Sequence, residues 1–353
     1  MKAVVMIGPC PDAKGGMASV VAVYRANGLF ASGDCRYLTT ATEGHGLRKL
    51  VVAASSLLRF FALLLAGRVA LLHVHGASHG SFWRKFAFMR LARLFSVPVI
   101  FHLHGGEFRQ FVDQRLGSAV RQRVVDTLAA CRLIYCLNEE VGDWLRTLVP
   151  GAVVQVMPNP IDLRAGAASH AKRAPCVLFL GRLEREKGVF DLVRAVAAIA
   201  HQVPGIRLTL CGAGSAGGDV EQLAIQNGIG HLVDFPGWVD GEVKADLLRR
   251  AGVFVLPSYA EGMPMAVLEA MAARTPVVAS RVGAVANMLE DGASGFIVEP
   301  GNVAMLGDAI LAALTDGKTT HLMTERAAVR VRTLYAADVV IERLRQRYSE
   351  LSA

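Results

Sequence analysis

Residues 257–272 combine a proline, two glutamates and a run of apolar residues in a pattern that can bind a phosphorylated ligand. A strand is predicted to end near Leu256, and Pro264 suits the first position of a helix because its φ angle is already helical. The amides of Met265 and Ala266 then have no partner within the helix and lie at the positive end of its dipole. A phosphate group is favoured at such a helix start.

Two carboxylates, Glu261 and Glu269, lie on either side of this helix start. Glu269 falls one turn deeper, on the face of Met265 and Ala266, where it can accept hydrogen bonds from ribose hydroxyls while the helix start holds a diphosphate. Glu261 precedes the helix and can meet a sugar beyond the phosphates. Alone, Glu269 could merely complement the helix dipole, but the whole segment favours a nucleotide-sugar site. Its donor-binding residues are Gly262, Met263, Pro264, Met265, Ala266 and Glu269.

The segment 181–188 supplies cations for the same ligand. It follows a predicted strand and precedes a helix, and α/β folds bind ligands at the carboxyl ends of strands. Arg182 can contact a diphosphate through two hydrogen bonds, and Lys187 can do so as a point charge, although such a turn alone is typical of a solvated surface. The paired glycines Gly15 and Gly16, after the first strand, allow a close backbone approach to phosphate.

Metal ligands are poorly represented in the sequence. No Asp-x-Asp pair is present to bridge a metal to a diphosphate, and the nearest segment, 240–242, is interpreted as a loop. Two His-x-His pairs, His73 with His75 and His102 with His104, each end a predicted strand and share a face. Zinc is an alternative, because imidazole is a common ligand, but neither a His-Glu-x-x-His motif nor a cysteine supports it. We expect no metal and no cofactor, interpret His104 as presented to a ligand cleft, and expect core roles for the others.

Gly212, Gly214 and Gly217 match the letters of the dinucleotide-binding fingerprint, and Asp234 is near the distance expected of its ribose-binding acid. We interpret this match as coincidental, because the segment 261–269 already accounts for a nucleotide.

Two series of alternating strands and helices position these residues. Apolar runs predict strands at 3–7, 69–74, 97–103, 133–137 and 153–157, and then at 176–180, 208–211, 253–256, 276–279 and 296–298. This alternation implies parallel sheets with helices on both faces. The predicted fold class is α/β, with two tandem, doubly wound, Rossmann-like domains at 1–163 and 164–336 that face each other across a cleft. A linker is placed at 159–175.

The excess of positive charge lies in the first half of the chain. The 353 residues carry a net charge of +8; residues 1–165 hold 19 Lys and Arg against 10 Asp and Glu, a net +9, so the remainder carries −1. Between Glu43 and Glu107 there are eight bases and no acid. Such a stretch suits an anionic partner: a membrane surface, nucleic acid or a phosphorylated substrate. The six cysteines form no CxxC pair, which is typical of reduced thiols in a cytosolic protein.

An amphipathic helix is predicted at 47–66. It contains Arg59 and is too short in apolar residues to span a bilayer. Arg48, Lys49 and Arg59 form a basic polar edge. We expect peripheral binding to an anionic membrane; the alternative is a helix that only packs on the sheet. The predicted membrane-facing residues are Arg48, Lys49, Arg59, Trp83, Arg84 and Lys85.

With these residues in place, the chain resembles the family 4 retaining glycosyltransferases of the GT-B fold. The resemblance is strongest over 177–300, through GRLEREKG at 181–188, GAG at 212–214, FPGWV at 235–239, EGMPMAVLEAMA at 261–272, TPVVAS at 275–280 and DGASGFIVEP at 291–300. The first half matches more loosely, through Gly15-Gly16, His104-Gly105 and Asn159-Pro160-Ile161-Asp162. The family often has Gly-Val where this chain has Pro160-Ile161, a change that affects the linker rather than the chemistry.

The resemblance implies roles for the residues already singled out. Glu269 would contact the ribose, while Glu261 and the loop amides would hold the hydroxyls of the donor sugar. Arg182 and Lys187 would neutralise the diphosphate, and Gly16 would close against it. His104 would lie near the anomeric centre, which makes His104, Arg182, Lys187 and Glu261 the expected catalytic set. The last helix, at about 337–353, would cross back to the first domain.

The implied function is a metal-independent, retaining transfer of a sugar from a nucleotide-sugar donor. The acceptor would be a glycan or a polyprenyl-diphosphate-linked sugar in bacterial surface-polysaccharide assembly, with the protein in the cytoplasm, peripheral on the inner face of the cytoplasmic membrane. No nucleic acid partner is expected. Two alternatives remain open: a nucleotide-sugar epimerase on the same fold, and a non-catalytic membrane-binding or partner-binding module.

Overall fold

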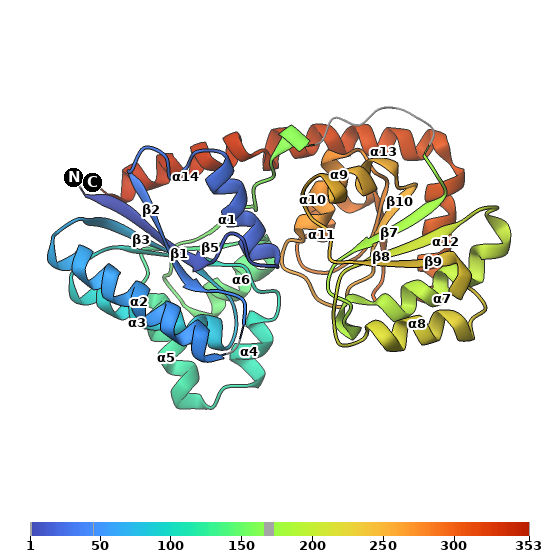
Figure 1. Cartoon of the computed structure of the whole chain (residues 1–353). Helices are drawn as coiled ribbons and strands as arrows, with labels where there is room; N and C mark the ends of the chain where they lie inside the picture. Colours follow the sequence, from blue (N-terminus) through green and yellow to red (C-terminus); the bar gives the residue numbers. More distant parts are fainter. Residues whose placement is uncertain (1, 45, 166–172, 353) are drawn as a thin grey trace. The chain divides into compact units, whose positions relative to one another are not determined.

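The computed structural model describes residues 2–44, 46–165 and 173–352, and the chain divides into two units (Figure 1). Unit 1 comprises Met1–Asp162 and Tyr335–Ala353, and unit 2 comprises Leu163–Leu334. Each unit is built on a six-stranded sheet whose neighbouring strands are all parallel. The α/β class with two doubly wound parallel sheets, predicted from the alternation of apolar runs and helical patterns, is confirmed.

The sheet of unit 1 has the strand order β2-β1-β3-β4-β5-β6. This order reverses between β1 and β3, and sheets of this kind bind ligands at such a switch point. The second strand was not predicted, because it is an edge strand in which polar and partly exposed side chains separate the buried Cys35 and Thr40. The strands are β1 (Ala3–Pro9), β2 (Cys35–Ala41), β3 (Val69–Gly76), β4 (Val99–Leu103), β5 (Leu133–Cys136) and β6 (Val154–Val156).

Helices cover both faces of this sheet. Helices α1 and α14 lie on one face, and α2, α3 and α5 lie on the other (Figure 1). The side chains of β3 alternate to match: Leu72 and Val74 join the apolar core under α2 and α3, whereas His73 and His75 face α14 and α1. The helices are α1 (Gly16–Ala26), α2 (Gly46–Leu65), α3 (Gly80–Leu94), α4 (Phe108–Gln114), α5 (Ser118–Ala129), α6 (Glu139–Leu148) and α14 (Ala337–Ser352).

The final helix is fastened to unit 1 at both ends. At its start, the Ala337 amide donates to the Ile161 carbonyl at 2.9 Å, and the Ile161 amide donates to the Tyr335 carbonyl at 2.8 Å. Near its end, the buried Tyr348 hydroxyl hydrogen-bonds to Nδ1 of His73. The chain therefore returns to its first unit after completing the second.

The sheet of unit 2 has the strand order β12-β11-β10-β7-β8-β9, and this order reverses between β10 and β7. The loops after these two strands, 181–188 and 257–264, are therefore neighbours at the carboxyl edge of the sheet. The strands are β7 (Cys176–Leu180), β8 (Arg207–Cys211), β9 (Val233–Gly237), β10 (Val253–Leu256), β11 (Val277–Ser280) and β12 (Phe296–Val298). The helices are α7 (Val189–Ile199), α8 (Gly217–Gln226), α9 (Gly241–Arg250), α10 (Met265–Ala272), α11 (Val285–Met288), α12 (Val303–Thr315) and α13 (Gly317–Arg330).

Candidate active site

The two motifs recognised separately in the second half of the sequence are in contact in unit 2. The Tyr259 amide donates to the Glu186 carbonyl at 2.8 Å, and the Tyr259 hydroxyl donates to the buried carboxylate of Asp191 at 2.7 Å. Gly188 has a φ of +68°, and a Cβ placed there would lie 2.0 Å from the carbonyl oxygen of Pro257. Only glycine permits this approach, so the loop after β7 is held directly against the loop after β10.

This contact pairs two of the three predicted catalytic side chains of the loops. Nζ of Lys187 donates to Oε1 of Glu261 at 2.7 Å, and the Ser258 hydroxyl donates to the same oxygen at 2.8 Å. Both charged side chains are largely buried, with 17% of Lys187 and 12% of Glu261 exposed. The carboxylate is therefore fixed in position before any ligand binds, with a cation beside it.

Arg182 is placed differently from Lys187. Its guanidinium donates to Glu186 at 2.6 Å, and both side chains of this pair are exposed. An ion pair at the surface contributes little to stability, because water screens it and two long side chains must be ordered. Arg182 can therefore leave Glu186 for a bound anion at small cost.

Helix α10 starts one residue later than predicted. Pro264 has φ −70° and ψ 119°, so it is the residue preceding the helix rather than its first member, because its ψ is extended. Within the described residues, the amides of Met265 and Ala266 donate to no backbone or side-chain acceptor. The preceding loop is braced by the Ala284 amide, which donates to the Gly262 carbonyl at 2.8 Å. The correction leaves the two predicted amides available for a phosphate.

Glu269 has a partner that the sequence analysis missed. Nζ of Lys244, on α9, donates to Oε1 of Glu269 at 2.6 Å, and both side chains are mostly buried. The segment 240–242, interpreted above as a loop, instead leads into α9, with Asp240 at the capping position. Had the segment 240–242 been recognised as a helix start, Lys244 would have been placed on a helix. Its contact with Glu269 could still not be predicted, because the two residues are 25 positions apart in the chain. Glu269, like Glu261, is thus held by a lysine.

The glycines that imitate a dinucleotide-binding fingerprint have a packing role. A Cβ on Gly212 would lie 1.7 Å from the Gly181 carbonyl oxygen, and one on Gly214 would lie 2.3 Å from that of Leu183. These glycines allow the loop after β8 to cross the loop after β7 closely. This accounts for their presence without a second nucleotide site.

The predicted residues of unit 1 lie at the carboxyl ends of β1 and β4. Gly15 has a φ of +130° and caps α1, so the turn requires glycine there, while a Cβ on Gly16 would meet no atom within 4 Å. His104 follows β4, and its Nε2 lies 2.7 Å from Nδ1 of His75. Burial, with the neighbouring His102 and His73, lowers the pKa of His104 well below its ordinary value, so the ring is neutral at physiological pH.

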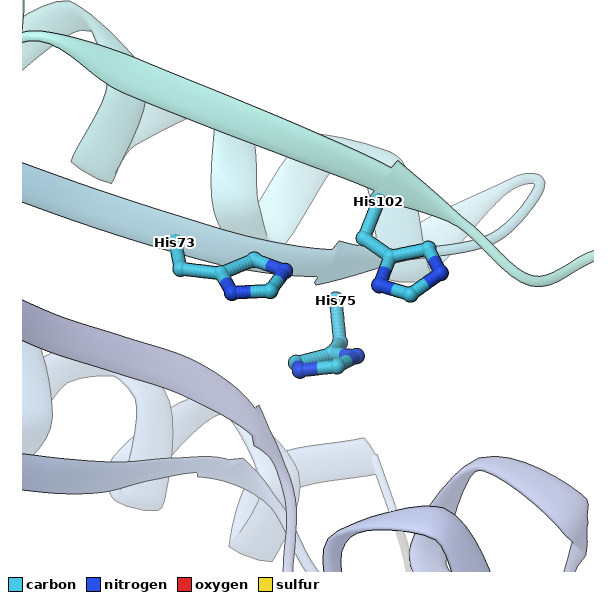
Figure 2. Close-up of side chains that lie close together, drawn as sticks. All are labelled: His73, His75 and His102. Carbon is cyan, nitrogen blue, oxygen red and sulfur yellow. The ribbon is translucent and has the colours of Figure 1, made fainter. Parts of the chain in front are cut away.

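His104 is the outer member of a buried cluster on β3 and β4, and Figure 2 shows the three inner rings, His73, His75 and His102. His75 and His102 are register partners on neighbouring strands. The ring planes of His73 are tilted by only 20° from His75 and 15° from His102. Burial lowers the pKa of all three, that of His102 to about 3. The cluster is therefore a stack of neutral rings.

The three inner histidines form the single candidate metal group among the described residues, since their nitrogen atoms lie within 4.8 Å of one another. A nitrogen lone pair lies in the plane of its ring. Near-parallel rings therefore cannot aim at one ion unless they turn, and Tyr348 holds His73 in its present orientation. The geometry fits the predicted core role better than a metal centre.

The predicted membrane-facing set needs one correction. Arg48 and Arg59 are exposed on α2, and Lys49, Trp83 and Arg84 are partly exposed. Lys85 is not at the surface: only 1% of it is exposed, its ammonium donates to Ser81, and burial lowers its pKa to about 7. Position 85 falls on the sheet-facing side of α3, between the buried Phe82 and Phe88. Its prediction as a membrane-facing residue was wrong.

Helix α2 exposes more apolar surface than its basic edge suggested. Its solvent-facing side presents Leu50, Leu58 and Leu65, of which 61%, 70% and 65% are exposed. Phe61 continues this face and contacts Phe95, which follows α3, with ring centroids 6.0 Å apart. A membrane-spanning helix was not expected, and a search of the described helices finds none that is long and apolar enough to cross a bilayer.

Comparison with known proteins places both units in established families. The family described as Glycosyltransferase Family 4 matches residues 14–165, and the one described as Glycosyl transferases group 1 matches residues 165–330. The chain is 30% identical over 254 residues to the glycogen synthase of Mycobacterium tuberculosis (strain CDC 1551 / Oshkosh), a match that covers 68% of this chain and 60% of that protein. The chain thus spans about three fifths of the length of this relative.

Two solved structures are similar to this chain over nearly its full length. Sucrose-phosphate synthase from Thermosynechococcus elongatus superposes with a TM-score of 0.83 at 22% identity, covering 99% of each chain. Anabaena HepE, crystallised in complex with UDP-glucose, superposes with a TM-score of 0.76 at 17% identity, covering 99% of this chain and 100% of that one. At these identities the likeness establishes the fold.

Proposed function

The chain belongs to the family 4 glycosyltransferases of the GT-B fold, and on that premise we propose that it transfers a sugar from a nucleotide-sugar donor to a glycan or polyprenyl-diphosphate-linked acceptor, with retention of configuration and without a metal ion. The observation that carries this proposal is the pair of lysine-held glutamates on either side of an open helix start. Lys187 holds Glu261, Lys244 holds Glu269, and the free amides of α10 lie between the two carboxylates along the chain.

Each part of this arrangement suits one part of the donor. The amides of Met265 and Ala266 suit a phosphate, because they are unpaired donors at a positive helix end. Glu269, one turn deeper, suits the ribose hydroxyls, and Glu261 suits the sugar hydroxyls. A UDP-sugar is the first donor to test, since the similar HepE was crystallised with UDP-glucose.

The cations suit a leaving diphosphate without a metal. As the bond from the anomeric carbon to the phosphate oxygen breaks, negative charge grows on the diphosphate, and Arg182 and Lys187 would stabilise that charge more in the transition state than in the ground state. The acceptor oxygen forms the new bond on the same face of the sugar, and its proton passes to the departing phosphate oxygen. The two carboxylates assigned to the donor, Glu261 and Glu269, are each paired with a lysine, so neither is offered as a nucleophile or as part of a metal-binding pair.

His104 is proposed to contact the donor sugar near its reacting carbon. Its ring is neutral, so it would act as a hydrogen-bonding group rather than as a cation. Its Nε2 is already joined to His75 at 2.7 Å, which fixes the orientation of the ring. Gly15 and Gly16 would let the start of α1 approach the diphosphate.

We also propose that unit 1 rests on an anionic membrane, which suits a lipid-linked acceptor and a cytoplasmic, peripheral location in surface-polysaccharide assembly. The exposed apolar face of α2, with Phe95 beside it, is the kind of patch that marks an interaction site. Arg48 and Arg59 lie on the same helix and would meet anionic head groups. Insertion of apolar side chains, with basic residues around them, is the expected mode of binding.

The decisive experiment offers UDP-, GDP- and ADP-sugars to the protein with and without lipid-linked or glycan acceptors, in the presence of EDTA. Nucleoside diphosphate released only with an acceptor, with the anomeric configuration of the product retained, supports the proposal. Conversion of the donor into an epimer without any acceptor would instead identify an epimerase. A ligand at 100 times its Kd should add about 2.7 kcal/mol of stability, which a thermal-shift screen detects. If no nucleotide sugar stabilises the protein in that screen, the remaining alternative is a non-catalytic binding module.

A further inference from the structure

A cavity of about 400 Å³ lies in unit 1, away from the residues assigned to sugar transfer. It is lined by the end of α3, the segment 96–99 that leads into β4, and the second half of α5 with residues 130–132. Because β4 begins at Val99 and ends at Leu103, the cavity lies at the amino edge of the sheet, whereas His104 lies at the carboxyl edge. It is therefore a separate site.

Four arginines line this cavity, and we call it the arginine pocket. They are Arg90, Arg93, Arg123 and Arg132. None of the four forms an ion pair among the described residues, although Arg121, on the same helix as Arg123, pairs with Asp113. The only acid in the lining, Asp126, accepts a hydrogen bond from Gln122 at 2.8 Å. The lining thus carries four positive charges against one negative charge.

The ends of the nearby helices explain only part of this charge. A helix C-terminus carries a partial negative charge that favours a basic residue in the last turn. Arg93 is in the last turn of α3, but the last turn of α5 has no basic residue. Arg123 lies in the middle of α5, and Arg132 lies beyond its end. Arg90, outside the last turn of α3, lies over the Phe86 ring at 5.8 Å. Among the described residues, Arg123 and Arg132 have neither a helix end nor an aromatic ring beside them, and an anion from outside the chain can meet their charge.

The remaining lining indicates that this anion has an apolar part. Phe86, Met89, Val97, Pro98 and Ala130 also border the cavity. Between the lining residues Arg93 and Ser96, the chain forms an exposed apolar rim: 75% of Leu94 is exposed, and Phe95 contacts Phe61 on the apolar face of α2. A phosphate offers the planar, bidentate contacts that arginine prefers, and acyl chains would follow the apolar rim.

We propose that the arginine pocket binds the phosphate group of an anionic lipid, held by Arg90, Arg93, Arg123 and Arg132 at the edge of the face that meets the membrane. The site rests on the proposed docking of α2, but it is independent of the transfer reaction. It would bind one lipid head group specifically, beyond the general attraction of a basic surface, and so hold unit 1 in one orientation on the bilayer.

The test uses the full chain and a soluble short-chain lipid, so it requires neither docking nor catalysis. Calorimetric titration with monomeric dihexanoyl phosphatidic acid should give saturable binding that weakens as salt rises. The double variant Arg123→Gln/Arg132→Gln should weaken this binding at least tenfold. Arg121→Gln, which removes one positive charge from the same helix as Arg123 but outside the pocket, should leave it unchanged. UDP binding and the melting temperature of each variant show that unit 2 and the fold are intact.

Other probes separate the remaining sources of such an anion. Inorganic phosphate should bind at least tenfold more weakly than the lipid; equal binding of both, lost together in the double variant, would overturn the lipid and leave a site for free phosphate. Binding that Arg121→Gln weakens as much as the double variant would overturn the pocket in favour of diffuse charge. If the pocket binds an acidic peptide but not the lipid, and the double variant loses that binding, the lipid proposal is also overturned, because the partner would then be a protein. If the wild-type protein binds the lipid but transfers no sugar from any UDP-sugar, only the proposed function is contradicted.

Discussion

Nζ of Lys187 lies 2.7 Å from Oε1 of Glu261, although the two residues come from motifs 74 positions apart. The pair joins the cation turn after β7 to the loop before α10. Each side chain is mostly buried, and the ion pair holds both in place. We propose that a donor binds beside this pair without breaking it, with its phosphate next to the lysine and its sugar next to the glutamate.

Replacing both Arg182 and Lys187 with alanine should reduce turnover more than donor binding, because the charge that they meet grows as the phosphate leaves. We expect a loss of kcat of at least a hundredfold with a smaller change in the Kd of the donor. Steady-state kinetics and calorimetry on the same preparation measure the two effects. A double variant with normal turnover would remove these residues from the mechanism.

Glu269→Gln should weaken binding of the bare nucleotide, whereas Glu261→Gln should spare it and impair binding of the sugar-bearing donor. Loss of a charge-assisted hydrogen bond to a ribose hydroxyl should cost about 1.5–3 kcal/mol, or roughly tenfold to over a hundredfold in Kd. Titrations with UDP and with a UDP-sugar compare the two variants. If both variants bind both ligands equally badly, the division of roles is wrong.

Lys244→Met provides a matched control for Glu269, because it removes the lysine partner and leaves the carboxylate. If the lysine mainly positions Glu269, nucleotide binding should weaken by less than in Glu269→Gln. Titration with UDP measures this difference. A larger loss in Lys244→Met than in Glu269→Gln would mean that Lys244 itself contacts the nucleotide.

The histidine cluster should make the protein less stable as the pH falls below about 6.5. Burial lowers the pKa of His102 to about 3 and those of His73 and His75 well below 6.5. The unfolded chain therefore binds these protons first, and stability is fully present above pH 6.5 and lost on acidification. The slope is about 1.4 kcal/mol per pH unit for each histidine that protonates only on unfolding. Denaturant unfolding at pH 6.5 and 5.0 measures it, and an unchanged slope in His102→Leu would contradict this account.

Membrane docking should depend on both the basic and the apolar residues of α2. Reversing Arg48, Lys49 and Arg59 to Glu should release the protein from anionic liposomes, and Leu50→Ser/Leu58→Ser should weaken binding that persists at high salt. A base near an anionic leaflet contributes about 1 kcal/mol, and salt screens this attraction. Co-sedimentation measures both variants, with UDP binding as the control for folding. Equal partition onto neutral and anionic vesicles would reject the electrostatic contribution.

The sequence by itself determined the fold class and the strongest part of the site. Its apolar runs match most strands because buried parallel strands are almost uniformly apolar. Of the four edge strands, β2 and β9 were missed because their exposed sides carry polar residues. Pro264 located the open helix start, because its backbone constraint acts over a few neighbouring residues. A site feature can be predicted from the sequence when the residues that cause it are neighbours in the chain.

Only the tertiary structure decided which side chains meet. The partnership of Lys244 with Glu269, the burial of Lys85, the contact of His75 with His104 and the convergence of four arginines at one pocket all depend on helices and strands that are distant in the chain. A helical pattern indicates that one face will be buried, but not which neighbour will bury it. Lys85 shows the physical reason: a charge on the sheet-facing side of α3 is buried because the surrounding Phe82 and Phe88 pack into the core, and its four-carbon stem packs with them.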